Sequence, residues 1–158
     1  MSFIWRIGNY ANLEGRGGLK ASGRWHTRGR PIVYCASSPS AAILESLANF
    51  EIDSVDDLPS GYQLLQIEMP DTVSRVRVEL KDLPPNWMDV SEISRTRKKG
   101  DGWLAEAKYP ALEVPSSVAP KTWNTLLNPA LRAGTGIKVL GISRHPFDPR
   151  LFKIVQKP

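Results

Sequence analysis

Cysteine, histidine and long apolar runs are all scarce in this sequence. Among 158 residues there is one cysteine, Cys35, and there are two histidines, His26 and His145. A lone cysteine forms no internal disulfide, which favours a reducing compartment, and a structural zinc site needs about four Cys or His ligands. No apolar segment approaches the roughly 20 residues that span a bilayer, and the first ten residues lack the pattern of a signal peptide. We therefore expect a cytoplasmic protein with no metal site and no membrane span.

The familiar nucleotide-binding and hydrolase motifs are missing as well. No GxxxxGK[ST] loop is present, which excludes a P-loop site, and the glycine-rich stretch at 15–18 lacks the GxGxxG order of a Rossmann fingerprint. A triad of Ser116, His145 and Asp148 lacks the GxSxG elbow that would support it. Cys35 lies in an apolar strand, which is typical of a buried, inert thiol and not of a nucleophile.

The composition and the local patterns predict one α+β domain over residues 1–158, since 41% of the residues are hydrophobic and 23% charged. Alternating or β-branched apolar residues predict short strands at 3–7, 32–36, 62–69, 75–80, 111–114 and 137–142. We expect 62–69 and 75–80 to pair with each other, antiparallel. Helices are predicted from Ser38 to about Phe50 and over 103–108, with one or two helical turns at 122–127. The expected fold is therefore compact, with mostly antiparallel strands and a few short helices.

The stretch from Gly23 to Leu47 places an arginine, a tyrosine and a carboxylate on three consecutive elements. Arg24 lies in a turn, Tyr34 in the apolar strand, and Glu45 in a helix. The residues about one helical turn before and after Glu45 are alanines, at positions 41 and 48. Small neighbours leave space above the carboxylate, and we expect Leu44 and Leu47 to face the core. The three groups suit an anionic ligand that carries a flat ring and develops positive charge. Taken one at a time, Tyr34 is better explained as a core tyrosine and Glu45 as a solvated glutamate, and Arg24 is also compatible with a solvated turn residue.

The net charge of +5 favours anionic partners such as nucleic acid or a phosphorylated small molecule. The one basic cluster, Ser94 to Gly100 (SRTRKKG), has no interleaved aromatic residues and is predicted to be a solvated loop. A non-catalytic nucleic-acid-binding module remains an alternative that uses this cluster.

Six short motifs, in order along nearly the whole chain, resemble the RES domain, the toxin of bacterial RES–Xre toxin–antitoxin systems. They are Gly23-Arg24-Trp25, Val33-Tyr34, Ala42 to Glu45, Val114-Pro115-Ser116, Asn128-Pro129 and Phe147 to Arg150. The resemblance implies a fold related to ADP-ribosyltransferase toxins and an enzyme that consumes NAD as its substrate, without a further cofactor. It implies hydrolysis or phosphorolysis of NAD, with transfer of ADP-ribose to a target protein as the alternative. The implied partners are NAD and an Xre-type helix-turn-helix antitoxin, in a homo-oligomer or hetero-oligomeric complex, with no direct binding of nucleic acid.

The same resemblance implies the site residues. The family's arginine, tyrosine, glutamate and serine fall on Arg24, Tyr34, Glu45 and Ser116, and a further arginine falls on Arg6. Nicotinamide departs from NAD as a neutral molecule, so catalysis has to stabilise a ribosyl cation, which is the role expected of Glu45.

We expect the other four residues to bind the dinucleotide. Arg24 and Arg6 suit the diphosphate because arginine offers planar, permanently charged donors. Tyr34 is expected to stack on nicotinamide, and Ser116 to hydrogen-bond ribose or the amide. One position departs from the family: Leu131 stands where many members have a histidine after the Asn-Pro pair.

Overall fold

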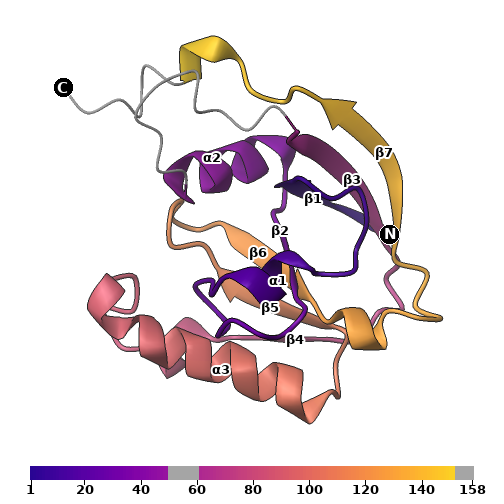
Figure 1. Cartoon of the computed structure of the whole chain (residues 1–158). Helices are drawn as coiled ribbons and strands as arrows, with labels where there is room; N and C mark the ends of the chain where they lie inside the picture. The colour runs from indigo at the N-terminus through magenta and orange to yellow at the C-terminus, as the bar shows by residue number, and fades with distance from the viewer. Residues whose placement is uncertain (50–60, 152–158) are drawn as a thin grey trace.

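Two small β-sheets form the centre of the computed structural model, which describes residues 1–49 and 61–151 (Figure 1). The three-stranded sheet has the order β1 (Ser2–Gly8), β3 (Gln63–Met69), β7 (Lys138–Arg144), with antiparallel pairing throughout. The four-stranded sheet has the order β2 (Val33–Cys35), β6 (Trp123–Leu127), β5 (Ala111–Pro115), β4 (Arg75–Arg77). Its pairs are antiparallel except for β4 and β5, which run parallel.

Backbone hydrogen bonds join the two sheets at one point. The N–H of Trp5 donates to the carbonyl of Ala36 at 2.9 Å, and the N–H of Ala36 donates to the carbonyl of Trp5 at 2.7 Å. Ile4, Leu65 and Ile67 of the three-stranded sheet pack in one buried cluster with Val33 and Leu127 of the other. The sheets therefore share a core, and β1 and β2 hold them together at the Trp5–Ala36 bridge.

Two longer helices lie on different sides of this arrangement (Figure 1). α2 (Pro39–Asn49) contacts β1, and α3 (Ile93–Glu106) covers the four-stranded sheet through a second buried cluster that includes Trp25, Trp103 and Leu126. The remaining helical segments are short: α1 (Gly17–Lys20) and the 3₁₀ turns Leu80–Asp82, Val90–Glu92, Pro129–Leu131 and Pro149–Leu151. Within the described ranges, no helix has the length and apolar character needed to cross a membrane.

The α+β class is confirmed, as is the helix that begins after Ser38. The Ser38 hydroxyl accepts a hydrogen bond from the N–H of Ala41 at 3.0 Å, which is the expected N-terminal cap. Leu47 is buried as predicted, but Leu44 is 45% exposed, and Ala42 takes the buried place instead. Phe50, the predicted end of this helix, lies outside the described residues.

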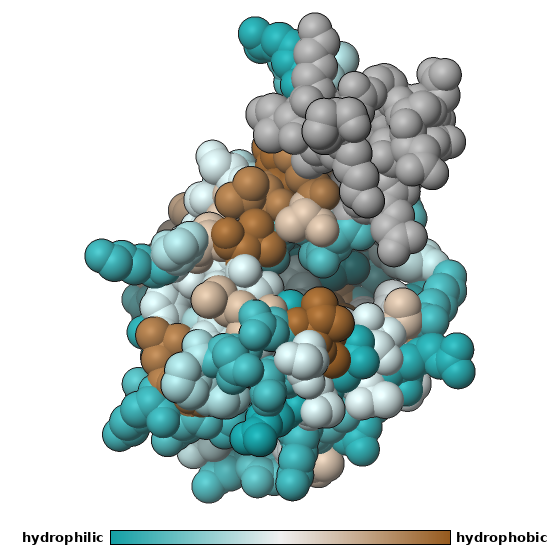
Figure 2. Space-filling view, turned by 90° about the vertical axis from the view of Figure 1, so that its left-hand side faces the viewer, coloured by the Kyte–Doolittle hydropathy of each residue, from teal (hydrophilic) through white to brown (hydrophobic). Residues whose placement is uncertain are grey.

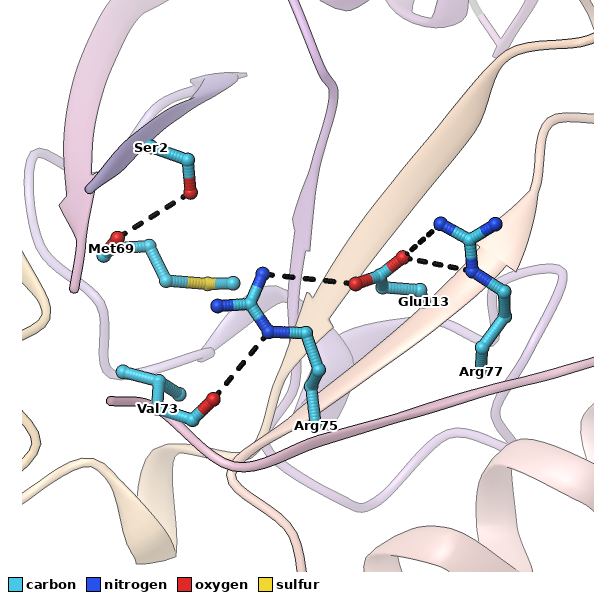
Figure 3. Close-up of polar contacts among 6 residues, drawn as sticks. All are labelled: Ser2, Met69, Val73, Arg75, Arg77 and Glu113. Carbon is cyan, nitrogen blue, oxygen red and sulfur yellow. Dashed lines mark hydrogen bonds and ion pairs between the residues drawn. The ribbon is translucent and has the colours of Figure 1, made fainter. Parts of the chain in front are cut away.

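Three other local predictions were wrong. The segment 75–80 forms a strand only over Arg75–Arg77, and it pairs with β5 of the other sheet and not with β3. Glu113 of β5 fastens this pairing, because its carboxylate takes the guanidinium groups of both Arg75 and Arg77 (Figure 3). The segment 122–127 forms β6, whose position between β2 and β5 outweighs its local helical pattern.

The basic cluster at 94–100 is helical, since α3 begins at Ile93 and not at Trp103. The buried face of this segment consists of small residues. The sequence therefore lacks the regular spacing of large apolar residues that would indicate a helix there. The Thr96 hydroxyl donates to the carbonyl of Arg24 at 2.6 Å. Gly100 packs directly on the carbonyl of Trp25, where an added Cβ would collide with main-chain atoms. The first two turns of α3 are therefore held to the turn that follows Gly23.

Candidate active site

A pocket of about 550 Å³ lies between α2, the Gly23 turn, α3 and the sheets. The face turned to the viewer in Figure 2 is hollowed near its centre, and hydrophilic and hydrophobic residues meet at the rim. Four of the five predicted site residues line the pocket: Arg6, Arg24, Tyr34 and Glu45. The fold thus gathers residues that are up to 39 positions apart, from Arg6 to Glu45, around one cavity.

The carboxylate of Glu45 is held in place from the sheet. Its Oε1 accepts hydrogen bonds from the hydroxyl of Ser116 at 2.5 Å and from the side-chain amide of Asn124 at 2.8 Å. Within the described part of the chain, its Oε2 accepts no hydrogen bond. One oxygen is therefore anchored while the other remains available to a ligand in the pocket.

Ser116 reaches the site through Glu45. It is 5% exposed and follows directly after β5, and its Oγ also accepts hydrogen bonds from the N–H groups of Val118 and Ala119 at 3.1 and 3.0 Å. These two donors fix the hydroxyl, so its single proton points to Glu45. The neighbour Ser117 lines the pocket, whereas Ser116 does not. The predicted contact between Ser116 and the ligand remains a prediction, and the geometry gives the residue a second role in orienting the carboxylate.

Tyr34 presents its ring to the pocket and its hydroxyl to the Gly23 turn. The hydroxyl lies 2.7 Å from Nδ1 of His26 and accepts a hydrogen bond from the N–H of Trp25 at 3.2 Å. Burial raises the pKa of Tyr34, so the phenol stays neutral. A Cβ on Gly23 would fall on this hydroxyl, which explains why glycine stands there. Tyr34 therefore shapes the turn that carries Arg24, whatever its ring contacts.

The imidazole of His26 is buried and completes the same turn. Nδ1 accepts from the N–H of Gly23 at 3.3 Å, and Nε2 lies 3.3 Å from the carbonyl of Gly18. This pattern assigns the proton to Nε2 and makes Nδ1 the acceptor for the Tyr34 hydroxyl. Burial lowers the pKa of His26, in agreement with a neutral ring.

Two arginines, one in the Gly23 turn and one in α3, line the pocket. Nη1 of Arg24 donates to the carbonyl of Trp87 at 3.3 Å, and Nε of Arg97, in α3, donates to the carbonyl of Gly23 at 2.8 Å. Burial lowers the pKa of Arg24, the charge of Arg97 lowers it further, and the charge of Glu45 partly offsets both effects. Cationic and anionic groups thus share the cavity without forming an ion pair among the described residues.

Arg6 forms another part of the pocket wall. Its Nε is buried and has no hydrogen-bond partner within the described residues. Cys35 also lines the pocket and is free and buried, and burial raises the pKa of its thiol to about 12, against the opposing effect of Arg6. The thiol is therefore protonated and unreactive at neutral pH. Over the ranges that the structure describes, no three His, Cys, Asp or Glu residues gather where they could hold a metal ion.

The sequence reasoning missed two residues of this site, Arg97 and Asn124. The sequence predicted a solvated loop around Arg97 and a helical turn around Asn124, and the structure of both segments differs from that prediction. The spacing of Thr96 and Gly100, one helical turn apart, is the signal that could have identified α3. Leu131, at the position where relatives often have histidine, lies in a 3₁₀ turn and does not line the pocket.

The chain resembles known proteins over most of its length. Residues 3–148 match the model of the RES domain. The chain is 44% identical to the Toxin Res of Pseudomonas putida over 94% of its own length and 99% of the relative's. It is 33% identical to the Prs ADP-ribosylating toxin of a Sphingobium species, covering 95% of this chain and 96% of that protein.

A solved structure shows the same fold. The crystal structure of the M. tuberculosis MbcT–MbcA toxin–antitoxin complex contains a chain that superposes with a TM-score of 0.72 at 16% identity. The match covers 98% of this chain and 88% of that chain. At this level of identity the likeness concerns the fold alone. With the family match over most of its length, the protein belongs to the RES domain family.

Proposed function

We propose that this protein is the toxin of a toxin–antitoxin pair and that it cleaves the nicotinamide–ribose bond of NAD. The observation that carries the reaction is the carboxylate of Glu45, which Ser116 and Asn124 hold by one oxygen at the wall of a pocket lined by arginines. The names of the relatives from Pseudomonas putida and Sphingobium support a toxin that acts as an enzyme.

The chemistry needs few groups. Nicotinamide leaves the positively charged pyridinium of NAD as a neutral molecule, so no general acid has to protonate it. Positive charge develops on the ribose, and a fixed carboxylate stabilises that charge in a partly buried site. Glu45 takes this role with its free Oε2. Water that attacks the anomeric carbon then forms ADP-ribose and releases one proton, whereas phosphate in place of water forms a ribosyl phosphate.

The remaining pocket residues suit the rest of the dinucleotide. Arg24 and Arg6 supply planar cationic donors for the diphosphate, and the ring of Tyr34 offers a flat surface for nicotinamide. NAD is the substrate, and the reaction requires neither a metal nor a further cofactor.

Transfer of ADP-ribose to a protein is the second candidate reaction. It uses the same ribosyl cation and differs only in the group that attacks it. The name of the Sphingobium relative, an ADP-ribosylating toxin, favours a protein as the acceptor. NAD labelled in its ADP-ribose part separates the two reactions, because transfer marks a discrete protein band in a bacterial lysate and hydrolysis marks none.

We further propose that an antitoxin of the Xre helix-turn-helix type binds this protein in the cytoplasm and covers the pocket. The structural neighbour comes from a toxin–antitoxin complex, which supports a protein partner of this kind.

The decisive experiment is to incubate the purified protein with NAD and measure nicotinamide release, with and without phosphate. We expect release by the native protein and a loss of at least about 100-fold in Glu45→Gln, which removes the charge but keeps the shape. Glu106→Gln, which changes an exposed carboxylate of α3, is the matched control and should behave as the native protein. Absence of nicotinamide release and of protein labelling in a lysate would refute the proposed reaction.

A further inference from the structure

Two arginines of the pocket, Arg24 and Arg97, are each held by a main-chain carbonyl. The Nε–H of Arg97 donates to the carbonyl of Gly23 at 2.8 Å, and Nη1 of Arg24 donates to the carbonyl of Trp87 at 3.3 Å. Each arginine is thus held at one end by a main-chain carbonyl. The two terminal nitrogens of Arg97, together with Nε and Nη2 of Arg24, have no hydrogen-bond acceptor among residues 1–49 and 61–151. Both side chains line the 550 Å³ pocket.

Among the described residues, no carboxylate forms an ion pair with Arg24 or with Arg97. The charge of Arg97 lowers the pKa of Arg24, as expected for like charges in a half-buried place. Other arginines of the chain are differently placed: Arg75 and Arg77 share the carboxylate of Glu113 (Figure 3). The charge of Glu45 offsets this repulsion only in part, and an anion that binds both guanidinium groups relieves what remains of it.

We propose that Arg97 and Arg24 form one binding site for the diphosphate bridge of the dinucleotide, with Arg97 as a substrate-binding residue contributed by α3. The ligand class rests on the proposed function. The diphosphate bridge of NAD carries two negative charges, and Arg97 and Arg24 each bring one positive charge to it. Planar guanidinium groups also match adjacent phosphate oxygens through paired N–H donors.

The contacts of Thr96 and Gly100 with the Gly23 turn explain how Arg97 comes to lie at the pocket. Through these contacts the first turns of α3 pack on the main chain of Arg24 and Trp25. Arg97 lies between them in sequence and is thereby directed to the Gly23 carbonyl. Lys99, two residues further along the helix, points roughly to the opposite side and is exposed. The site therefore depends on one basic residue of the cluster at 94–100 and not on the charge of the cluster as a whole.

The test is calorimetric titration of the full chain with ADP-ribose, which keeps the diphosphate bridge and lacks nicotinamide. We expect Arg97→Ala to weaken binding roughly 10- to 100-fold, as for the loss of charged hydrogen bonds. Arg97→Lys should recover only part of the affinity, because lysine keeps the charge but not the planar pair of donors. Lys99→Ala removes the same charge from the other face and should bind ADP-ribose as the native protein does.

Three results would overturn the proposal: no binding of ADP-ribose by the native chain, native affinity in Arg97→Ala, or equal weakening in Lys99→Ala. Thermal unfolding without ligand shows whether each variant folds. If Arg97→Ala does not, Arg97→Gln, which retains an N–H for the Gly23 carbonyl, replaces it. Nicotinamide release by the native protein is measured separately. Arg97-dependent binding without release refutes the reaction alone, and release with native binding in Arg97→Ala refutes the arginine site alone.

Discussion

Replacing Ser116 by alanine tests how the carboxylate of Glu45 is held. The change removes the 2.5 Å hydrogen bond to Glu45 and the acceptor for the N–H groups of Val118 and Ala119. A hydrogen bond to a charged group contributes about 1.5–3 kcal/mol and a neutral one about 1 kcal/mol. We therefore expect the free energy of unfolding to fall by about 2–4 kcal/mol. For a chain of this length, this corresponds to a decrease in melting temperature of roughly 5–15 °C.

The effect on the reaction should be smaller than that of removing the carboxylate. Asn124 still holds Oε1 of Glu45 at 2.8 Å, so the carboxylate stays near its place but gains freedom. Misplacing a catalytic group in this way reduces the rate by about 10- to 100-fold. Nicotinamide release should fall to this extent in Ser116→Ala, with the Michaelis constant for NAD nearly unchanged.

A double-mutant cycle with Glu45→Gln separates orientation of the carboxylate from direct contact with NAD. If Ser116 acts through the Glu45 carboxylate, Ser116→Ala should slow the Glu45→Gln enzyme little further, because residues that act as a unit are not additive. Equal slowing in both backgrounds would refute this reasoning and would favour a hydroxyl that touches the substrate.

Two further predictions concern the Gly23 turn and its support. Gly100→Ala should lower the free energy of unfolding by about 3 kcal/mol in urea, because the added methyl group meets the carbonyl of Trp25. Gly102→Ala, where no atom lies near the added group, should instead be neutral or stabilising by up to about 1 kcal/mol. Burial lowers the pKa of His26, so the unfolded chain binds a proton at higher pH than the folded one. The free energy of unfolding should therefore decrease as the pH falls below about 6.5. Urea unfolding at pH 7.5 and 5.5 should show a smaller decrease in His26→Gln, and an equal one would contradict the assignment of a buried neutral ring.

Local sequence patterns were enough for the elements whose apolar residues alternate or recur over several positions. They identified β1, β3, β5 and the start of α2, where the Ser38 cap and the buried Leu47 agree with prediction. They failed where partners distant in sequence decide the structure. β4 has three residues and owes its pairing to Glu113, and β6 is a strand because it lies between two others. The first turns of α3 were predicted to be a loop because Thr96 and Gly100, and not large apolar side chains, form their contact with the rest of the chain.

The residues of the candidate site also divide into those that local motifs identify and those that distant contacts bring into place. Arg6, Arg24, Tyr34 and Glu45 were placed by a resemblance in short motifs, and the structure brings all four to one pocket. Asn124 and Arg97 carry no such motif. The hydrogen bond of Asn124 reaches a residue 79 positions away and that of Arg97 a carbonyl 74 positions away. Such contacts depend on the packing of β6 and α3, which no local pattern specifies.

The two bonds that hold Glu45 have a consequence for synthesis of the protein. They join α2, early in the chain, to Ser116 and Asn124, which lie 71 and 79 residues further on. Translation delivers the chain from its N-terminus at about 5–20 residues per second. A nascent polypeptide that ends before Ser116 therefore has neither hydrogen bond to this carboxylate, however well its first half is folded. Both hydrogen bonds can form only when most of the chain has left the ribosome.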